Sequence, residues 1–214
     1  MLALSLFAVA IYYHFAHAQF DHYQAHRKTV VHTWDMRVYY PIAKFFKELQ
    51  FDGLYLACLQ GYLEDHPQTT DEELARVRLR DLSNNEVVSG LSVKSQAQAI
   101  KTRFTPERWE EFKRDMRWFD QAMGPHYLGS MTDHGGNATP LWMGVGHLLF
   151  KDTKDVEGMM SLTAWIDPIL LLILFVVIGR TFGWTPMCVC MIVFGATEFY
   201  RFGSNLMGST LRQD

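Results

Sequence analysis

Apolar residues are concentrated toward the two ends of the chain. Residues 1–20 contain no Lys, Arg, Asp or Glu, residues 168–178 form an unbroken apolar run, and residues 181–197 are uncharged. A helix that is apolar on every face is typical of a membrane span, which needs about 20 residues. The pattern therefore predicts a mainly α integral membrane protein with about three transmembrane helices and a largely helical extracytoplasmic domain.

The last two apolar segments are close enough in sequence to predict an antiparallel helical hairpin, with its turn at residues 180–184. Two alternatives stay open: a signal peptide cleaved near Ala16-His17-Ala18, and a buried hairpin of a soluble protein. An uncleaved anchor is favoured because no basic residue precedes the first apolar stretch. The predicted parts are an N-terminal transmembrane anchor (1–20), an extracytoplasmic helical domain (21–158), a transmembrane hairpin (159–200) and an extracytoplasmic tail (201–214).

The long central segment carries the patterns of several helices and few strands. Residues 70–73 form a capping box, Thr105-Pro106 begins a helix that Gly124-Pro125 ends, and residues 141–150 form a short, nearly uncharged helix. A short pair of strands is predicted near residues 86–93. The helix after Thr105 has an apolar face and a solvated face that includes Asp115. Its apolar face consists of Trp109, Phe112, Met116 and Phe119.

A further helix is predicted over residues 41–49, with Pro41 in its first turn. Its apolar stripe includes Phe45 and Phe46 beside basic residues, a combination that suits a helix lying flat on a membrane. We therefore predict that these two aromatic residues contact lipid or a partner subunit. The same role is predicted for Trp165 and Trp184.

Charge is unevenly distributed along the 214 residues, whose net charge is −3. Of the 20 Lys and Arg residues 17 lie between His17 and Met160, as do 20 of the 23 Asp and Glu residues. A nearly balanced charge argues against nucleic acid as a partner, which requires a concentrated basic face. The short loop after the second apolar segment holds Arg180, and basic residues in short loops favour the cytoplasmic side. The sequence thus predicts a protein of the bacterial inner (cytoplasmic) membrane whose long loop faces the periplasm.

Histidines are frequent just after the first apolar segment, but the sequence specifies no complete metal site. His22 and His26 are four residues apart, so on a helix they would share a face, as metal ligands can. Polar histidines at a membrane interface are the favoured alternative, and haem ligation by His14 or His17 has no further support. The three Cys form no zinc or disulfide pattern, and no cofactor is identified. The candidates for chemistry in this region are His14, His17, Asp21, His22, His26, His32 and Asp35.

One carboxylate is distinguished by its position. Asp35 follows the first predicted span, among aromatic residues, and is predicted to lie in the first external loop. A carboxylate at a membrane surface beside an aromatic helix can serve as a general base toward a lipid-linked substrate. The alternative is a structural role, in which Asp35 pairs with Arg37 or caps the helix that begins at Pro41.

Five stretches carry a resemblance: His32–Tyr40, Phe51–Tyr55, Arg103–Trp109, Asn137–Leu141 and Leu211–Asp214. Together they resemble a family of bacterial polytopic membrane proteins that are similar to GT-C glycosyltransferases, which use lipid-linked sugars. The resemblance runs over nearly all of the chain and corresponds to the N-terminal part of such proteins, so their further spans are missing here.

The resemblance implies that an Asp of the first external loop acts as a base or as a metal-associated carboxylate. That role would fall to Asp35. It also implies a helical external loop lying on the membrane. A second carboxylate motif is not clear in this chain, and Glu198 is a candidate for it.

Two functions are therefore expected. The favoured one is a non-catalytic accessory subunit of a larger membrane complex of photosynthetic or respiratory type, with the lipid bilayer and other membrane-protein subunits as partners. The alternative is an incomplete GT-C-type glycosyltransferase that uses a polyprenyl-phosphate sugar donor, with Asp35 as the catalytic residue. Three helices alone are too few to close a cavity around a lipid donor, which favours the accessory role.

Overall fold

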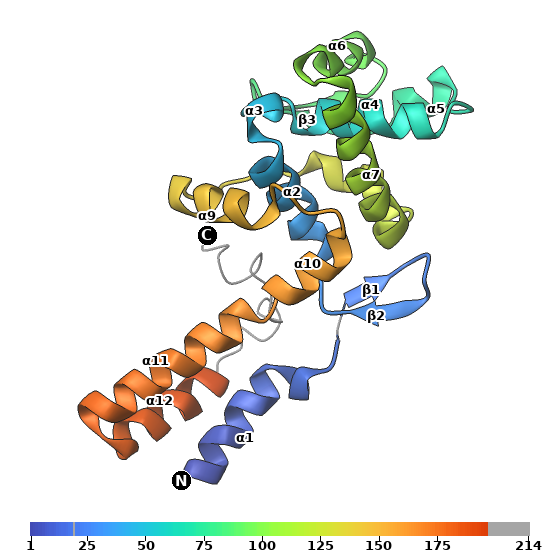
Figure 1. Cartoon of the computed structure of the whole chain (residues 1–214). Coiled ribbons are helices and arrows are strands. Elements are labelled where there is room, and N and C mark those ends of the chain that lie inside the picture. Colours follow the sequence, from blue (N-terminus) through green and yellow to red (C-terminus); the bar gives the residue numbers. More distant parts are fainter. Residues whose placement is uncertain (19, 197–214) are drawn as a thin grey trace. The chain divides into compact units, whose positions relative to one another are not determined.

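The computed structural model describes residues 1–18 and 20–196, and these residues are mainly helical (Figure 1). The chain divides into two compact units. The first, termed the apolar unit, contains the described residues of Met1–Phe20, Lys28–His32 and Glu157–Asp214. The second, termed the central unit, contains Asp21–Arg27 and Thr33–Val156. The predicted tail over 201–214 and the candidate carboxylate Glu198 lie outside the described residues.

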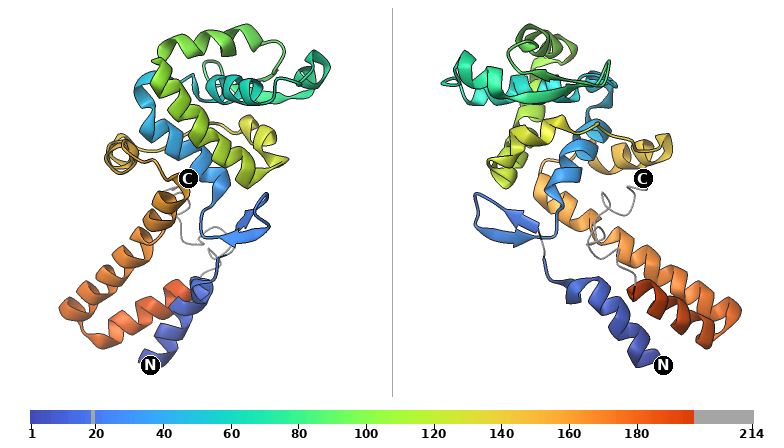
Figure 2. Two further views of the ribbon diagram at one scale, coloured as in Figure 1. Left: turned by 45° about the vertical axis from the view of Figure 1, so that its right-hand side comes forward. Right: turned by 180° about the vertical axis from the view of Figure 1, so that it is seen from behind.

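The apolar unit is built around an antiparallel helical hairpin, as the sequence predicts. Its turn is at Gly183, whose φ of +95° is a left-handed value that glycine adopts without strain. The hairpin helices pack on each other, and the second packs on the first helix of the chain (Figure 2). The helices of this unit are α1 (Leu2–Tyr12), the short 3-10 helix η1 (His14–Ala16), α10 (Val156–Thr163), α11 (Ile166–Phe182) and α12 (Trp184–Gly195).

Helices α1 and α12 approach each other closely because one of them ends in a glycine. A Cβ atom added to Gly195 would lie 2.3 Å from the backbone carbon of Ala8, closer than two such atoms can come. Small residues allow helix backbones to touch in this way, and packing of this kind is common between helices in membranes. The buried centre of the hairpin itself consists of Phe175, Met187, Cys188 and Met191.

One helical stretch of the described chain is long and apolar enough to cross a bilayer, judged by length and composition alone: Val156–Phe182, which joins α10 and α11. The apolar helices α1 and α12 have 11 and 12 residues. At 1.5 Å per residue they reach about 16–18 Å, against about 30 Å of hydrocarbon. The predicted mainly helical class is confirmed. The other two helices that were predicted as spans, α1 and α12, are each shorter than the thickness of the hydrocarbon.

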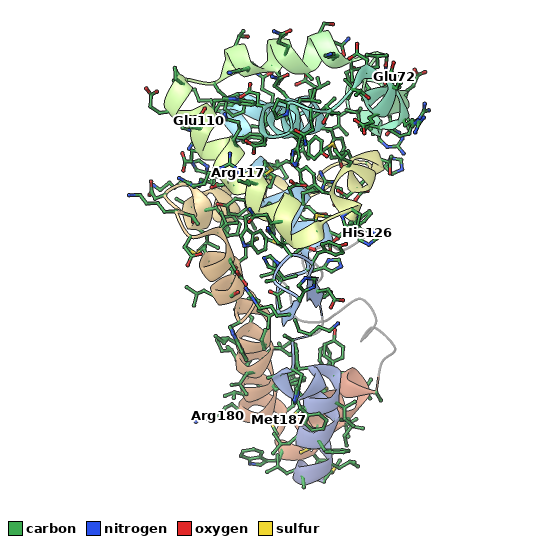
Figure 3. All side chains as sticks on the ribbon, turned by 90° about the vertical axis from the view of Figure 1, so that its right-hand side faces the viewer. Glu72, Glu110, Arg117, His126, Arg180 and Met187 are labelled. Carbon is green, nitrogen blue, oxygen red and sulfur yellow. The ribbon has the colours of Figure 1, made fainter. Side chains whose placement is uncertain are left out.

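The central unit carries most of the charged side chains (Figure 3). Glu72, Glu110, Arg117 and His126 belong to it, whereas the sticks around Arg180 and Met187 in the apolar unit are nearly all carbon. Its elements are α2 (Thr33–Lys44), α3 (Phe46–Leu49), α4 (Leu54–Asp65), α5 (Asp71–Arg76), β3 (Arg78–Asp81), β4 (Glu86–Ser89), α6 (Lys94–Ile100), η2 (Lys101–Arg103), α7 (Pro106–Met123), α8 (His126–Gly129), η3 (Ser130–Thr132) and α9 (Pro140–Phe150).

Helix α7 is the central packing element of this unit and forms as its sequence predicts. The Thr105 side chain caps it by accepting a hydrogen bond from the Arg108 N–H, and Gly124 ends it at a φ of +54°. The predicted apolar face is buried against α2 and α4. The predicted capping box of Thr70 and Glu73 begins α5. A pair of short strands forms, but only β4 lies within the predicted residues 86–93, and its partner β3 precedes that range.

The structure corrects the predicted start of a helix at Pro41. Helix α2 begins at Thr33 and continues through Pro41 to Lys44, although Pro41 offers no N–H to the carbonyl of Arg37. Most of the side chains from Asp35 to Lys44 are buried, so packing on several sides of α2 outweighs the lost hydrogen bond. The predicted membrane-surface helix is thus the end of a core helix, followed by the single turn α3.

A short hairpin also replaces the helix that was considered around His22 and His26. Strands β1 (Phe20–His22) and β2 (Arg27–Thr29) pair with each other. In the turn, the N–H groups of Tyr23 and Gln24 donate to the carbonyls of Ala122 and Gln121, at 2.8 and 3.1 Å. These partners lie almost 100 positions away, so local periodicity gives no sign of them.

Replacing Gly195 by leucine tests the close approach of α1 and α12. We expect Gly195→Leu to destabilise the full chain in a detergent micelle by about 1–3 kcal/mol, because the backbones must separate. Thermal unfolding followed by circular dichroism measures this. Gly144→Ala in α9 is the control, since a Cβ there meets nothing within 4 Å. Equal melting temperatures for the two variants would contradict the packing described.

Candidate functional site

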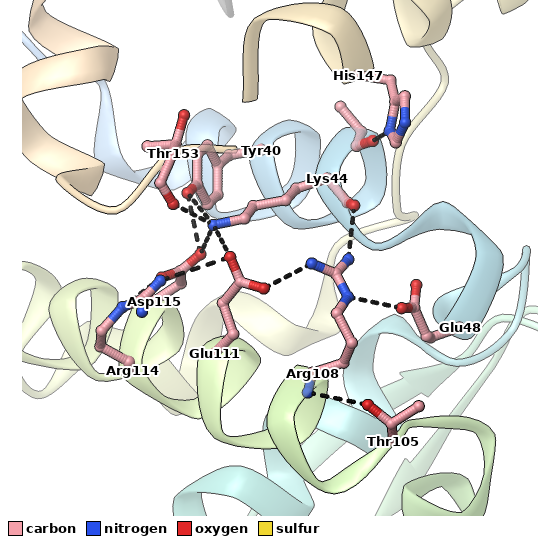
Figure 4. A network of polar contacts seen from close by, with 11 residues as sticks. Tyr40, Lys44, Glu48, Thr105, Arg108, Glu111, Arg114, Asp115, His147 and Thr153 are labelled. Atoms are coloured by element: carbon pink, nitrogen blue, oxygen red, sulfur yellow. Dashed lines mark hydrogen bonds and ion pairs between the residues drawn. The ribbon is translucent and has the colours of Figure 1, made fainter. Parts of the chain in front are cut away.

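A buried polar network surrounds Lys44, at the C-terminal end of α2 (Figure 4). Its ammonium group donates hydrogen bonds to Asp115 Oδ2 at 2.7 Å, to the Thr153 carbonyl at 2.5 Å and to the Tyr40 hydroxyl at 3.3 Å. Glu111 Oε1 lies 2.8 Å from the same nitrogen. The side chains of Lys44 and Asp115 are both 0% exposed. We term Tyr40, Lys44, Glu111, Asp115 and the Thr153 carbonyl the Lys44 network.

Every oxygen of the buried Asp115 carboxylate is used. The Tyr40 hydroxyl donates to Oδ2 at 3.0 Å, and the guanidinium of Arg114 donates to Oδ1 at 2.8 and 3.1 Å. A buried charge is tolerated only when it is paired and hydrogen-bonded in this way, because transfer from water costs several kcal/mol. The sequence placed Asp115 on the solvated face of α7, and the structure corrects this.

A second arginine connects the network to α3. Arg108 donates from Nη1 to Glu111 Oε2 at 2.6 Å and from Nε to Glu48 Oε1 at 2.8 Å. It also donates to the carbonyl of Lys44 at 3.1 Å, and its guanidinium carbon lies 4.4 Å from the centre of the Phe45 ring. The charges of the network and its surroundings therefore alternate in sign, which limits the cost of their burial.

These contacts shift two acid groups in opposite directions. Burial raises the pKa of Tyr40, and the negative charge of Asp115 raises it further, so this phenol stays protonated and donates. Burial by itself would raise the pKa of Glu111, but the ammonium of Lys44 and the guanidinium of Arg108 outweigh it and lower the pKa. The Glu111 carboxylate is thus held in its charged form.

The Lys44 network joins three parts of the central unit that are remote in sequence: α2, α7 and the segment that follows α9. The Nδ1–H of His147 on α9 adds a bond to the Ala43 carbonyl at 2.9 Å. A lysine, a phenol and two carboxylates are groups that catalyse proton transfer when substrate reaches them. Here Lys44 and Asp115 are sealed from solvent, so the arrangement acts as a structural connection.

An open polar cleft lies beside the network, with a volume of about 640 Å³. Four of its side chains are basic and four are acidic, so the cleft offers no excess charge to attract an ion of either sign. The lining residues are Glu107, Arg108, Glu110, Glu111, Arg114, Lys151, Asp152 and Lys154.

The predicted catalytic residue Asp35 lies in the first turn of α2 and not in a loop, and it is 4% exposed. Arg37, which the structural alternative pairs with Asp35, is also buried in α2. Its guanidinium donates to the Ser130 carbonyl at 2.6 Å and lies 5.0 Å from the centre of the Tyr55 ring. Both side chains of this turn therefore point into the packed interior of the central unit.

The predicted membrane contact of Phe45 is wrong. This side chain is 0% exposed and packs edge-on against Phe112, with ring centres 5.3 Å apart. Phe46 is 39% exposed and contacts Phe51 in a T-shaped arrangement at 5.2 Å, so it stays a candidate for contact with lipid or a partner. Trp165 and Trp184 are both exposed in the apolar unit and stay candidates too.

The weak metal candidates His22 and His26 do not share a helix face. His22 is in β1 and accepts a hydrogen bond at Nδ1 from the Ala25 N–H at 3.3 Å, while His26 is in the hairpin turn at a φ of +49°. In the part of the chain that the structure describes, no group of three or more His, Cys, Asp or Glu residues is arranged to hold a metal ion.

Comparison with known proteins gives no match: no family model fits the chain, and no curated protein or solved structure is significantly similar to it.

Replacing Lys44 by methionine tests whether burial makes the network important for stability. We expect Lys44→Met to lower the free energy of unfolding by about 3–5 kcal/mol, because Asp115 is left buried without its cation. The matched control is Lys94→Met, which breaks an ion pair of the same 2.7 Å length whose side chains are 52% and 63% exposed. That loss should stay below about 1 kcal/mol.

A double variant separates the charge from the packing. In Lys44→Met/Asp115→Leu no uncompensated charge of this pair remains, so most of the stability should return. Chemical denaturation monitored by tryptophan fluorescence measures all three variants. Equal losses for Lys44→Met and Lys94→Met would mean that the buried pair has no special role.

Proposed function

We propose that the chain is a membrane-anchored, non-catalytic accessory subunit of a larger membrane-protein complex. The observation that carries this proposal is the surface of α11. Seven apolar side chains on it are each between 50% and 61% exposed within the chain. Apolar surface in water costs about 25 cal/mol per Å², so such a helix requires lipid or partner helices around it. The seven are Ile169, Leu170, Leu172, Ile173, Leu174, Val176 and Val177.

The proposed anchor consists of all three apolar helices that pack together in the apolar unit. Val156–Phe182 crosses the bilayer, α12 packs on α11, and α1 packs on α12 to complete a three-helix anchor. The membrane is the bacterial inner membrane, and the central unit faces the periplasm. The position of Arg180 in the last turn of α11 supports this direction, since basic residues favour the cytoplasmic side.

The burial of the acid–base groups favours an accessory subunit over a glycosyltransferase. A general base must come within hydrogen-bonding distance of its substrate. Asp35 is 4% exposed, and Lys44 and Asp115 are sealed from solvent. The same groups hold the helices of the central unit together, which suits a rigid domain that presents a surface to partner subunits.

Gentle solubilisation of the native membrane, followed by native mass spectrometry, tests the proposal. We expect the chain in one assembly, at a fixed ratio to other membrane-embedded subunits. We also expect no transfer from a polyprenyl-phosphate sugar by the purified chain, with Asp35→Asn and the exposed control Asp71→Asn assembling like the natural protein. A free chain that transfers sugar, and loses this activity in Asp35→Asn alone, would establish the glycosyltransferase instead.

A further inference from the structure

Helix α9 has two apolar faces, and only one of them is used within the central unit. Trp142, Gly146 and Phe150 are buried on the inner face, toward α2. The opposite face carries Leu141 and Leu148, which are 79% and 70% exposed. Val145 lies between them and is 44% exposed. These three positions are spaced i, i+4 and i+7, so they form one stripe along the helix.

The orientation of this stripe is fixed by tight packing behind it. A Cβ atom on Gly146 would lie 3.0 Å from the Cβ of Ala43, so α9 lies directly on α2. The bond from His147 to the Ala43 carbonyl and the bond from Lys44 to the Thr153 carbonyl hold the end of α9 and the residues after it. Helix α9 therefore cannot rotate to bury the stripe within the unit.

We propose that α9 lies in the plane of the membrane interface, with Leu141, Val145 and Leu148 inserted at the boundary between headgroups and acyl chains. This inference rests on the proposed membrane anchor. Residues 151–155 connect α9 to the apolar helix that begins at Val156, and six residue steps span at most about 20 Å. The end of α9 therefore lies within that distance of Val156, where this long apolar helical stretch begins.

The length and charge of α9 favour a lipid surface as the occupant. Eleven residues extend about 16 Å, which is too short to cross about 30 Å of hydrocarbon but suits a helix lying in the interface. No Lys, Arg, Asp or Glu occurs from Pro140 to Phe150, whereas four exposed charged residues without net charge follow it: Lys151, Asp152, Lys154 and Asp155. Basic residues at that place can reach lipid phosphates while the stripe stays in contact with acyl chains.

Depth-dependent fluorescence quenching tests this placement. The full chain, with Cys190→Ser to remove its exposed thiol, receives one cysteine at Leu148 or, as the matched control, at the exposed Ser95 of α6. Each is labelled with an environment-sensitive dye and reconstituted into phosphatidylcholine–phosphatidylglycerol vesicles with or without nitroxide-labelled lipids. We expect a blue-shifted emission that nitroxide lipids quench at Leu148→Cys, and neither effect at Ser95→Cys.

Flotation of the same vesicles separates the possible failures. Chain that floats with the vesicles while the Leu148→Cys label is unquenched would overturn the interfacial placement and leave the anchor intact. A blue-shifted label that nitroxide lipids do not quench would mean that protein covers the stripe, which also overturns it. Chain that does not float at all would overturn the anchor and with it this inference.

Discussion

The buried ion pair of Lys44 and Asp115 is the constraint on which the central unit depends. Neither side chain is exposed, so each charge requires the other and the hydrogen bonds around them. These bonds come from α2, from α7 and from the backbone at Thr153, which are brought together from positions 40–44, 111–115 and 153. Hydrogen bonds are directional, so this network constrains the arrangement of these segments more narrowly than apolar packing does. It therefore fixes where the chain leaves the central unit, three residues before Val156.

The two units differ in what stabilises them. The central unit encloses aromatic residues around α7 and covers them with ion pairs, as water-facing domains do. The apolar unit leaves Leu, Ile and Val exposed around α11 and relies on close backbone contact at Gly195 and Ala8. Such a contact needs neither charge nor a large buried area, which suits helices that are surrounded by lipid. The division of the sequence into apolar ends and a charged middle thus corresponds to the two units.

Local patterns in the sequence predicted those elements whose stability is local. The capping box at Thr70, the apolar face of α7, the helix after Thr139 and the strand β4 depend on neighbours within a few residues. The predictions failed where residues remote in sequence determine the local structure. Pro41 lies inside a helix because α2 is packed on several sides. Phe45 is buried because it packs against Phe112 of α7 and against Phe104, which precedes α7.

The candidate site depended on distant partners too. Asp115 was placed on a solvated face because its neighbours are charged, yet Lys44, 71 positions away, draws it inside. A signal was available, since Asp115 is three residues after Phe112 and four before Phe119, so it borders the apolar face of the helix. The exposed apolar face of α9 likewise becomes recognisable only when the packing of its other face on α2 is known. Asp35 was singled out by its position, and only its burial in α2 argues against a catalytic role.

Side-selective labelling of single cysteines tests the proposed membrane anchor most directly. In intact cells and in a Cys190→Ser background, a single cysteine at Ser95 of the central unit or at Thr181 near the end of α11 is exposed to a membrane-impermeant thiol reagent. If Val156–Phe182 crosses the inner membrane with the central unit in the periplasm, Ser95→Cys reacts in intact cells and Thr181→Cys reacts only after permeabilisation. Equal reaction of both cysteines in intact cells would contradict the account.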